Sequence, residues 1–292
     1  MRLEDRLKKE YRVIFSNKNA RPQWALRKND GSSDLIHCTI PFVGMDYCNQ
    51  DIKILVYAYA DELNNYRNNK QANLNNDDIA INRHRYIFDN TFCDKKRFFG
   101  DVCCQPFNNG TMAIVAYYIY LKLTNSKTMS PKEFYEKISF THFCKFSVDL
   151  QHLQSKDNYN NNAYAINELV ASFPYVKADI EILEPDYIIM PESFFNALKE
   201  QWSSINKSVK VIPILQLTKS NIMNRINETK YPRVQENDLE YNLKEWYAHL
   251  DDKIISRRLT GSYKLQFLSI FRYLDNLMEN GIEEIGVDDI QE

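Results

Sequence analysis

The sequence predicts an α/β protein: a three-layer αβα sandwich around a central, mainly parallel four-stranded sheet, with a helical C-terminal extension. Short apolar runs rich in branched and aromatic residues alternate with longer helical patterns, and no linker or internal repeat interrupts them. The 292 residues, 44% of them hydrophobic, suffice to bury a core. Only seven glycines and nine prolines exclude collagen-like and Pro/Gly-rich disordered chains.

The four predicted strands are short apolar runs. The clearest covers residues 53–60, where an unbroken stretch of Ile, Leu, Val, Tyr and Ala is flanked by polar residues, as in a strand buried on both faces. The other three cover 138–143, 187–190 and 209–215.

Helical patterns fill the intervals between these strands. They cover 110–123, 163–183 and 192–202, and two further helices are expected at 239–250 and 262–280. Strands that alternate with helices predict a parallel sheet covered on both faces. In such sheets ligands collect at the carboxyl ends of the strands.

Charge is distributed unevenly along the chain. The formal net charge is −2, but residues 1–30 contain nine basic and four acidic residues, whereas residues 271–292 contain one basic and seven acidic. The rest of the chain, without this acidic tail, is therefore basic by about four, which permits a nucleic-acid partner. The alternative is that the tail is simply a solvated helix end.

The chain has no apolar window long enough to span a membrane, and seven of its first eleven residues are charged, so a cytoplasmic protein without membrane contact is expected. The six cysteines form no Cys-x-x-Cys pair. They are therefore expected to be free thiols, with no metal site, and no cofactor is expected.

Polar segments follow the predicted strands. They lie at 58–63, 101–110, 141–147, 182–191 and 214–226, and a further segment precedes them at 40–47. In this order they resemble the uracil-DNA glycosylase superfamily, particularly its divergent bacterial uracil-DNA glycosylase-like members. The similarity covers residues 35–230 as an α/β domain, which leaves a basic N-terminal extension (1–34) and a helical C-terminal extension with the acidic tail (231–292), packed on the same domain.

The resemblance implies a carboxylate that orients water after the first strand. Asp61 and Glu62 compete for this role, because Ala58–Ala60 stand where the family usually has a loop with glycine and proline. Cleavage of an N-glycosidic bond builds positive charge on the sugar, which a nearby carboxylate stabilises. The alternative is that both residues cap the following helix.

The resemblance also implies base-binding residues. His142 stands in 141–145 where the family has a base-reading asparagine, and Gln216 begins the segment that replaces the family's His-Pro-Ser loop. Phe107 and Asn108 offer a stacking ring and an amide to an extruded base. His142 and Phe107 have structural alternatives as buried residues.

Candidate DNA contacts are basic side chains and one apolar wedge. Leu217 is expected to fill the gap that base flipping leaves, while Lys145 is expected to hold a phosphate, to pair with Asp61 or to remain solvated. The other candidates are Arg83, Arg85, Lys219 and Arg225. Basic residues of this kind are also common on solvated surfaces.

The expected function is that of a DNA glycosylase that flips out a modified or damaged base, hydrolyses its N-glycosidic bond and leaves an abasic site. The histidine at the base-reading position favours a modified base over plain uracil as the substrate. Phage DNA is one source of modified bases, which would give the protein a role in antiviral defence. The alternative is a non-catalytic nucleic-acid-binding or sensor protein on the same fold. An unrelated nucleotide-binding enzyme is disfavoured, because the chain lacks a glycine-rich phosphate loop.

Overall fold

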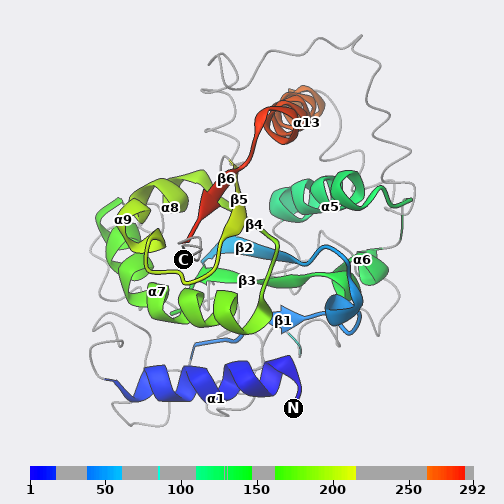
Figure 1. Ribbon diagram of the computed structural model, residues 1–292. Helices are drawn as coiled ribbons and strands as arrows, with labels where there is room; N and C mark the ends of the chain where they lie inside the picture. Colours follow the sequence, from blue (N-terminus) through cyan, green and yellow to red (C-terminus); the bar gives the residue numbers. More distant parts are fainter. Residues whose placement is uncertain are drawn as a thin grey trace, which may run out of the picture.

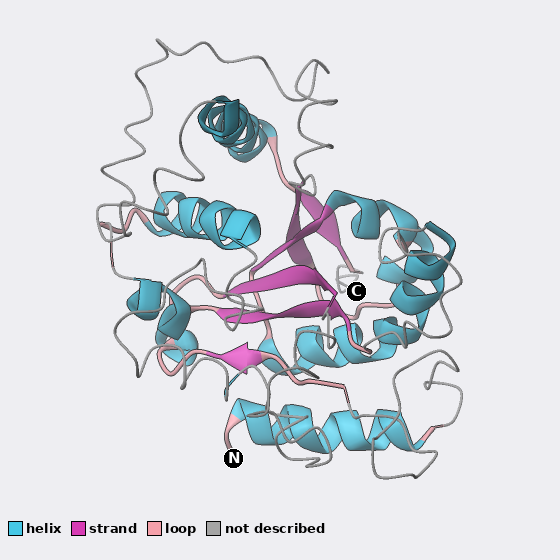
Figure 2. Cartoon of the chain, turned by 180° about the vertical axis from the view of Figure 1, so that it is seen from behind, coloured by secondary structure: helices cyan, strands magenta, loops and turns pink. Residues whose placement is uncertain are grey.

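A mixed sheet of six strands forms the centre of the computed structural model, with helices on both of its faces (Figure 1, Figure 2). The structure describes residues 1–17, 38–60, 85, 110–127, 129, 131–146, 162–214 and 262–286. The α/β class expected from the sequence is therefore present. In the described residues, no helix is long and apolar enough to cross a membrane.

Four strands form the middle of the sheet and all run parallel. In spatial order they are β3 (Ser139–Cys144), β2 (Ile54–Ala60), β4 (Tyr187–Pro191) and β5 (Val209–Ile214). Each lies within one residue of a predicted strand at both ends. The near-continuous apolar sequence of β2 and β4 suits strands that are covered on both faces.

The predicted sheet is nevertheless incomplete, because two short antiparallel strands extend it to six. β1 (Phe42–Val43) pairs with β3, and β6 (Glu283–Ile285) pairs with β5. Strands of two and three residues are too short to give a periodic apolar pattern, so the sequence offered no signal for them. β6 places part of the C-terminal segment in the sheet itself.

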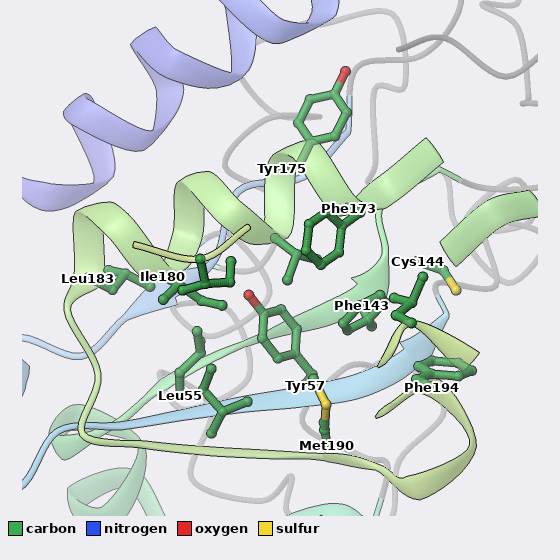
Figure 3. Packing of buried hydrophobic residues seen from close by; sticks show 14 of the residues in the cluster. Leu55, Tyr57, Phe143, Cys144, Phe173, Tyr175, Ile180, Leu183, Met190 and Phe194 are labelled. Carbon is green, nitrogen blue, oxygen red and sulfur yellow. The ribbon is translucent and has the colours of Figure 1, made fainter. Parts of the chain in front are cut away.

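One face of the sheet is covered by α7 (Asn162–Leu183), with α1 (Leu3–Ser16) packed against α7 (Figure 1). Tyr57 of β2 points from the sheet toward α7, and Phe173, Tyr175 and Ile180 of that helix belong to the same buried cluster (Figure 3). The short helices α8 (Glu192–Ala197) and α9 (Lys199–Trp202) complete this cluster with Phe194, Phe195 and Trp202. The sequence predicted these two as one helix, but Leu198 leaves the helical conformation between them.

The opposite face carries α5 (Gly110–Thr124), α6 (Pro131–Lys137) and α13 (Ser262–Asn280). The rings of Tyr118 and Phe271 stack with centroids 4.2 Å apart and join α5 to α13. The predicted helices at 110–123 and 262–280 are confirmed, whereas the one at 239–250 lies outside the described residues. A turn of 3-10 helix, η2 (Tyr47–Asn49), precedes β2.

Candidate active site at the carboxyl edge

The order of the parallel strands locates a switch point in the sheet. The chain passes from β2 to β3 on one side, and then crosses β2 to form β4 and β5 on the other side. β2 and β4 are therefore the neighbours from which the connections leave in opposite directions. In open α/β sheets, ligands bind outside the carboxyl ends of the strands at such a point.

β2 and β4 separate as they approach this edge. They pair only over Ile54–Val56 and Tyr187–Ile189. Beyond that, β2 keeps its pairing with β3 as far as Ala60 and Cys144, while β4 keeps its pairing with β5 as far as Pro191 and Ile214. The strand ends at the switch point are thus bound to their outer neighbours rather than to each other.

Several predicted site residues follow directly from these strand ends. Asp61 and Glu62 come next after Ala60, the last residue of β2, and Gln216 and Leu217 come two and three residues after the end of β5. All four side chains lie outside the described residues. Also outside them are Phe107, Asn108, Arg83, Lys219 and Arg225.

His142, the predicted base-reading residue, is a buried residue of β3. Its side chain is 3% exposed, and it is paired with Ala58 of β2. Side chains alternate along a strand, so His142 shares a face with Phe140, whose ring contacts Tyr135 of α6. It therefore lies under the helices of the α5 and α6 side, and in this arrangement it offers no surface to an extruded base.

Lys145, a predicted phosphate contact, also lies inside the protein. Its ammonium forms an ion pair with Asp179 of α7 at 2.7 Å, and neither side chain is exposed. It donates a second hydrogen bond to the hydroxyl of Thr141, and its backbone N–H donates to Ser172 Oγ. This placement differs from the expected contact with DNA and from the expected pairing with Asp61, because the partner comes from the middle of a helix.

Asp179 accepts hydrogen bonds from two tyrosines as well. Tyr11 of α1 donates to Oδ1 at 2.6 Å, and Tyr57 of β2 donates to Oδ2 at 2.9 Å. We call these two tyrosines, Lys145 and Asp179 the Asp179 cluster. All four residues are buried, and they come from α1, β2, α7 and the segment that follows β3.

Burial dominates the protonation of the Asp179 cluster. It lowers the pKa of the Lys145 ammonium and raises the pKa of the Asp179 carboxyl, while the attraction between the two groups opposes both shifts. Burial and the neighbouring Asp179 raise the pKa of both Tyr11 and Tyr57 well above the usual tyrosine value. The two hydroxyls therefore remain donors over the physiological pH range.

Arg85, another predicted DNA contact, is likewise paired within the protein. Its guanidinium lies 3.0 Å from a carboxylate oxygen of Glu4 in α1, donates to the carbonyl of Val43 and sits over the ring of Phe42, 4.3 Å from its centroid. The group that was expected to meet a phosphate instead joins α1 to β1.

Sequence reasoning missed two carboxylates of this region. Glu192 follows β4 directly and is half-buried at the start of α8, so it stands at the switch point of the sheet. Its signal was the same as that of Asp61, a carboxylate directly after an apolar run. Asp179 had another signal, because it lies between apolar Ala178 and Ile180 in a long helix, and an acid buried among apolar residues requires partners.

Among the described residues, no three His, Cys, Asp or Glu side chains are grouped so that they could hold a metal ion. Comparison of the chain with protein-family models, with curated proteins and with solved structures finds no match. The likeness to glycosylases therefore rests on the order of the strand-end segments in the sequence.

Proposed function

We propose that the protein is a monofunctional DNA glycosylase that extrudes a modified or damaged base and hydrolyses its N-glycosidic bond. One observation supports this above the others: the chain leaves β2 at the switch point of the sheet and continues directly into Asp61 and Glu62. A carboxylate pair at the place where α/β sheets bind ligands suits a reaction that develops positive charge on a sugar.

In the proposed reaction the bond between sugar C1′ and the base nitrogen breaks, and its electron pair leaves with the base. A water oxygen bonds to C1′, and the proton lost by that water neutralises the departing base. Asp61 or Glu62 orients the water and stabilises the cationic sugar in the transition state. Oxidation states do not change, and water is the only co-reactant.

The rest of the proposed binding surface is formed by segments that follow the other strands. Leu217 would enter the gap in the base stack, and Lys219 and Arg225 would neutralise phosphates nearby, with Arg83 as a further contact. Arg85 and Lys145 are not part of this surface, because both are already paired with carboxylates of the protein. DNA with modified bases, including phage DNA, is the proposed substrate class.

The experiment is to incubate the purified protein with plain DNA and with phage DNA that carries modified bases, and to score abasic sites by alkaline cleavage. We expect cleavage on modified DNA, and we expect Asp61→Asn to abolish it without weakening DNA binding. Asp51→Asn is the matched control, because Asp51 is exposed and precedes the opposite end of the same strand by three residues. DNA that is bound but never acquires abasic sites would exclude a glycosylase.

The burial of His142 favours a second candidate, a non-catalytic nucleic-acid-binding protein. A reading residue that is 3% exposed offers no edge for a base to bind. In that case the wild type binds DNA without forming abasic sites, and Asp61→Asn changes nothing.

A further inference from the structure

Three elements of the protein converge on a single carboxylate. Asp179 accepts one hydrogen bond each from Tyr11, Tyr57 and Lys145, and every one of these side chains is buried. Because hydrogen bonds to an ionised carboxylate are directional, these three bonds fix where each donor side chain points. Apolar packing alone does not do this.

Two of the donors lie beside the strand ends that lead into the candidate site. Tyr57 is three residues before the end of β2, and Lys145 is the first residue after β3. The last residues of these strands, Ala60 and Cys144, are paired with each other. Asp179 therefore ties the carboxyl ends of both strands to α7.

The third donor connects a distant element, α1, to Asp179. Tyr11 lies in α1, which packs against α7, and 168 residues separate it from Asp179 in the sequence. Tyr11 and Tyr57 each contribute one hydroxyl to the same carboxylate, but only Tyr57 belongs to a strand that leads into the site. This difference makes the two tyrosines a matched pair.

We propose that Asp179 is a positioning residue for the candidate active site, which it serves by fixing the carboxyl ends of β2 and β3 through Tyr57 and Lys145. This inference rests on the proposed glycosylase function. β2 and β4 do not pair beyond Val56 and Ile189, so the end of β2 lacks support from that side, and the Asp179 cluster supplies a support from α7 instead.

The test compares Tyr57→Phe with Tyr11→Phe, since each removes one hydroxyl from the same acceptor. On modified DNA we expect Tyr57→Phe to lower kcat about tenfold with KM within about twofold, because displacement of a positioned group acts on the chemical step. Tyr11→Phe should leave kcat within about twofold. Glu181→Gln, which removes an exposed acid two residues from Asp179 in α7, is a further control. Equal losses of kcat in both tyrosine variants would overturn the proposal.

A second measurement does not depend on catalysis. Amide hydrogen exchange is followed in Asp179→Asn and Tyr57→Phe at the strand ends, 58–60 and 144–146, and at the strand starts, 54–56 and 139–141. We expect exchange to rise at least about tenfold more at the ends than at the starts, where the rise reflects only the lower global stability of each variant. A uniform rise would contradict a positioning role even if the enzyme is active. If the wild type forms no abasic sites, the glycosylase proposal fails, and the exchange pattern still decides whether Asp179 fixes these strand ends.

Discussion

The ion pair between Lys145 and Asp179 gives a quantitative prediction for stability. The two charged atoms are 2.7 Å apart and neither side chain is exposed, so removal of one charge leaves the other buried without its partner. Breaking a buried pair in this way costs about 3–5 kcal/mol of unfolding free energy. We expect losses of this size for Lys145→Met and for Asp179→Asn when urea unfolding at pH 7 is followed by circular dichroism.

The double variant Lys145→Met/Asp179→Asn should be more stable than either single variant. Removing both charges eliminates their desolvation penalty, and the asparagine carbonyl oxygen still accepts a hydrogen bond from a tyrosine. We expect the free energy of unfolding of the double variant to exceed that of the less stable single variant by roughly 1–3 kcal/mol. A double loss that equals the sum of the single losses within about 0.5 kcal/mol would refute the reasoning, because the two charges would then be independent.

A control pair lies on the same helix. Lys177 and Glu181 are 3.8 Å apart, one turn from each other, with side chains 34% and 43% exposed. An exposed pair of this kind contributes about 0.5 kcal/mol or less. Removing either charge should therefore leave the urea midpoint nearly unchanged, which separates the effect of a buried charge from the effect of any substitution in α7.

Four more predictions concern other parts of the molecule. Alkylation at pH 8 should label exposed Cys48 and spare Cys38, because burial raises the pKa of the Cys38 thiol to about 12; labelling of both at equal rates would contradict the buried placement. Because folding raises the pKa of the Cys38 thiol, the protonated thiol contributes fully to stability below about pH 9, and this contribution is lost as the pH rises toward 12. Cys38→Ala should therefore flatten the decline of the unfolding free energy between these two pH values. Gly44→Ala should cost roughly 1–3 kcal/mol in thermal unfolding, because its Cβ would lie 2.2 Å from the carbonyl oxygen of Glu136; an unchanged melting temperature would show that the contact yields. Arg85→Gln should leave the salt dependence of DNA binding unchanged, whereas loss of one phosphate contact would lower the slope by about 0.9.

The four parallel strands were predictable because each is a short run rich in branched and aromatic residues, whereas β1 and β6 were too short to give a pattern. α1 was treated only as a basic extension, although Leu7, Tyr11 and Phe15 recur every four residues and form its buried face. The high density of charge in this segment obscured that stripe. Charges on the outer face of a helix do not prevent its apolar face from packing.

The candidate site was less predictable than the fold. The strand ends correctly indicate an edge at which β2 and β3 finish together, since Ala60 and Cys144 are paired. They did not show that Lys145 turns inward, because its partner Asp179 is 34 residues away and no local pattern joins the two. Whether a lysine meets water or a buried acid depends on tertiary packing, and one sequence does not encode that in its local spacing.

The hydrogen bond between Tyr11 and Asp179 has a consequence for folding during synthesis on the ribosome. At about 5–20 residues per second, the ribosome needs on the order of 10–30 s to make the 168 residues that separate the two partners. During that time α1 has emerged without the helix that covers its apolar face, whereas β5 waits a shorter time for β6, because Val209 and its partner Ile285 are closer in the sequence. α1 therefore waits longer than β5 for its packing partner, and its apolar stripe is a surface that a chaperone bound to the nascent chain would meet.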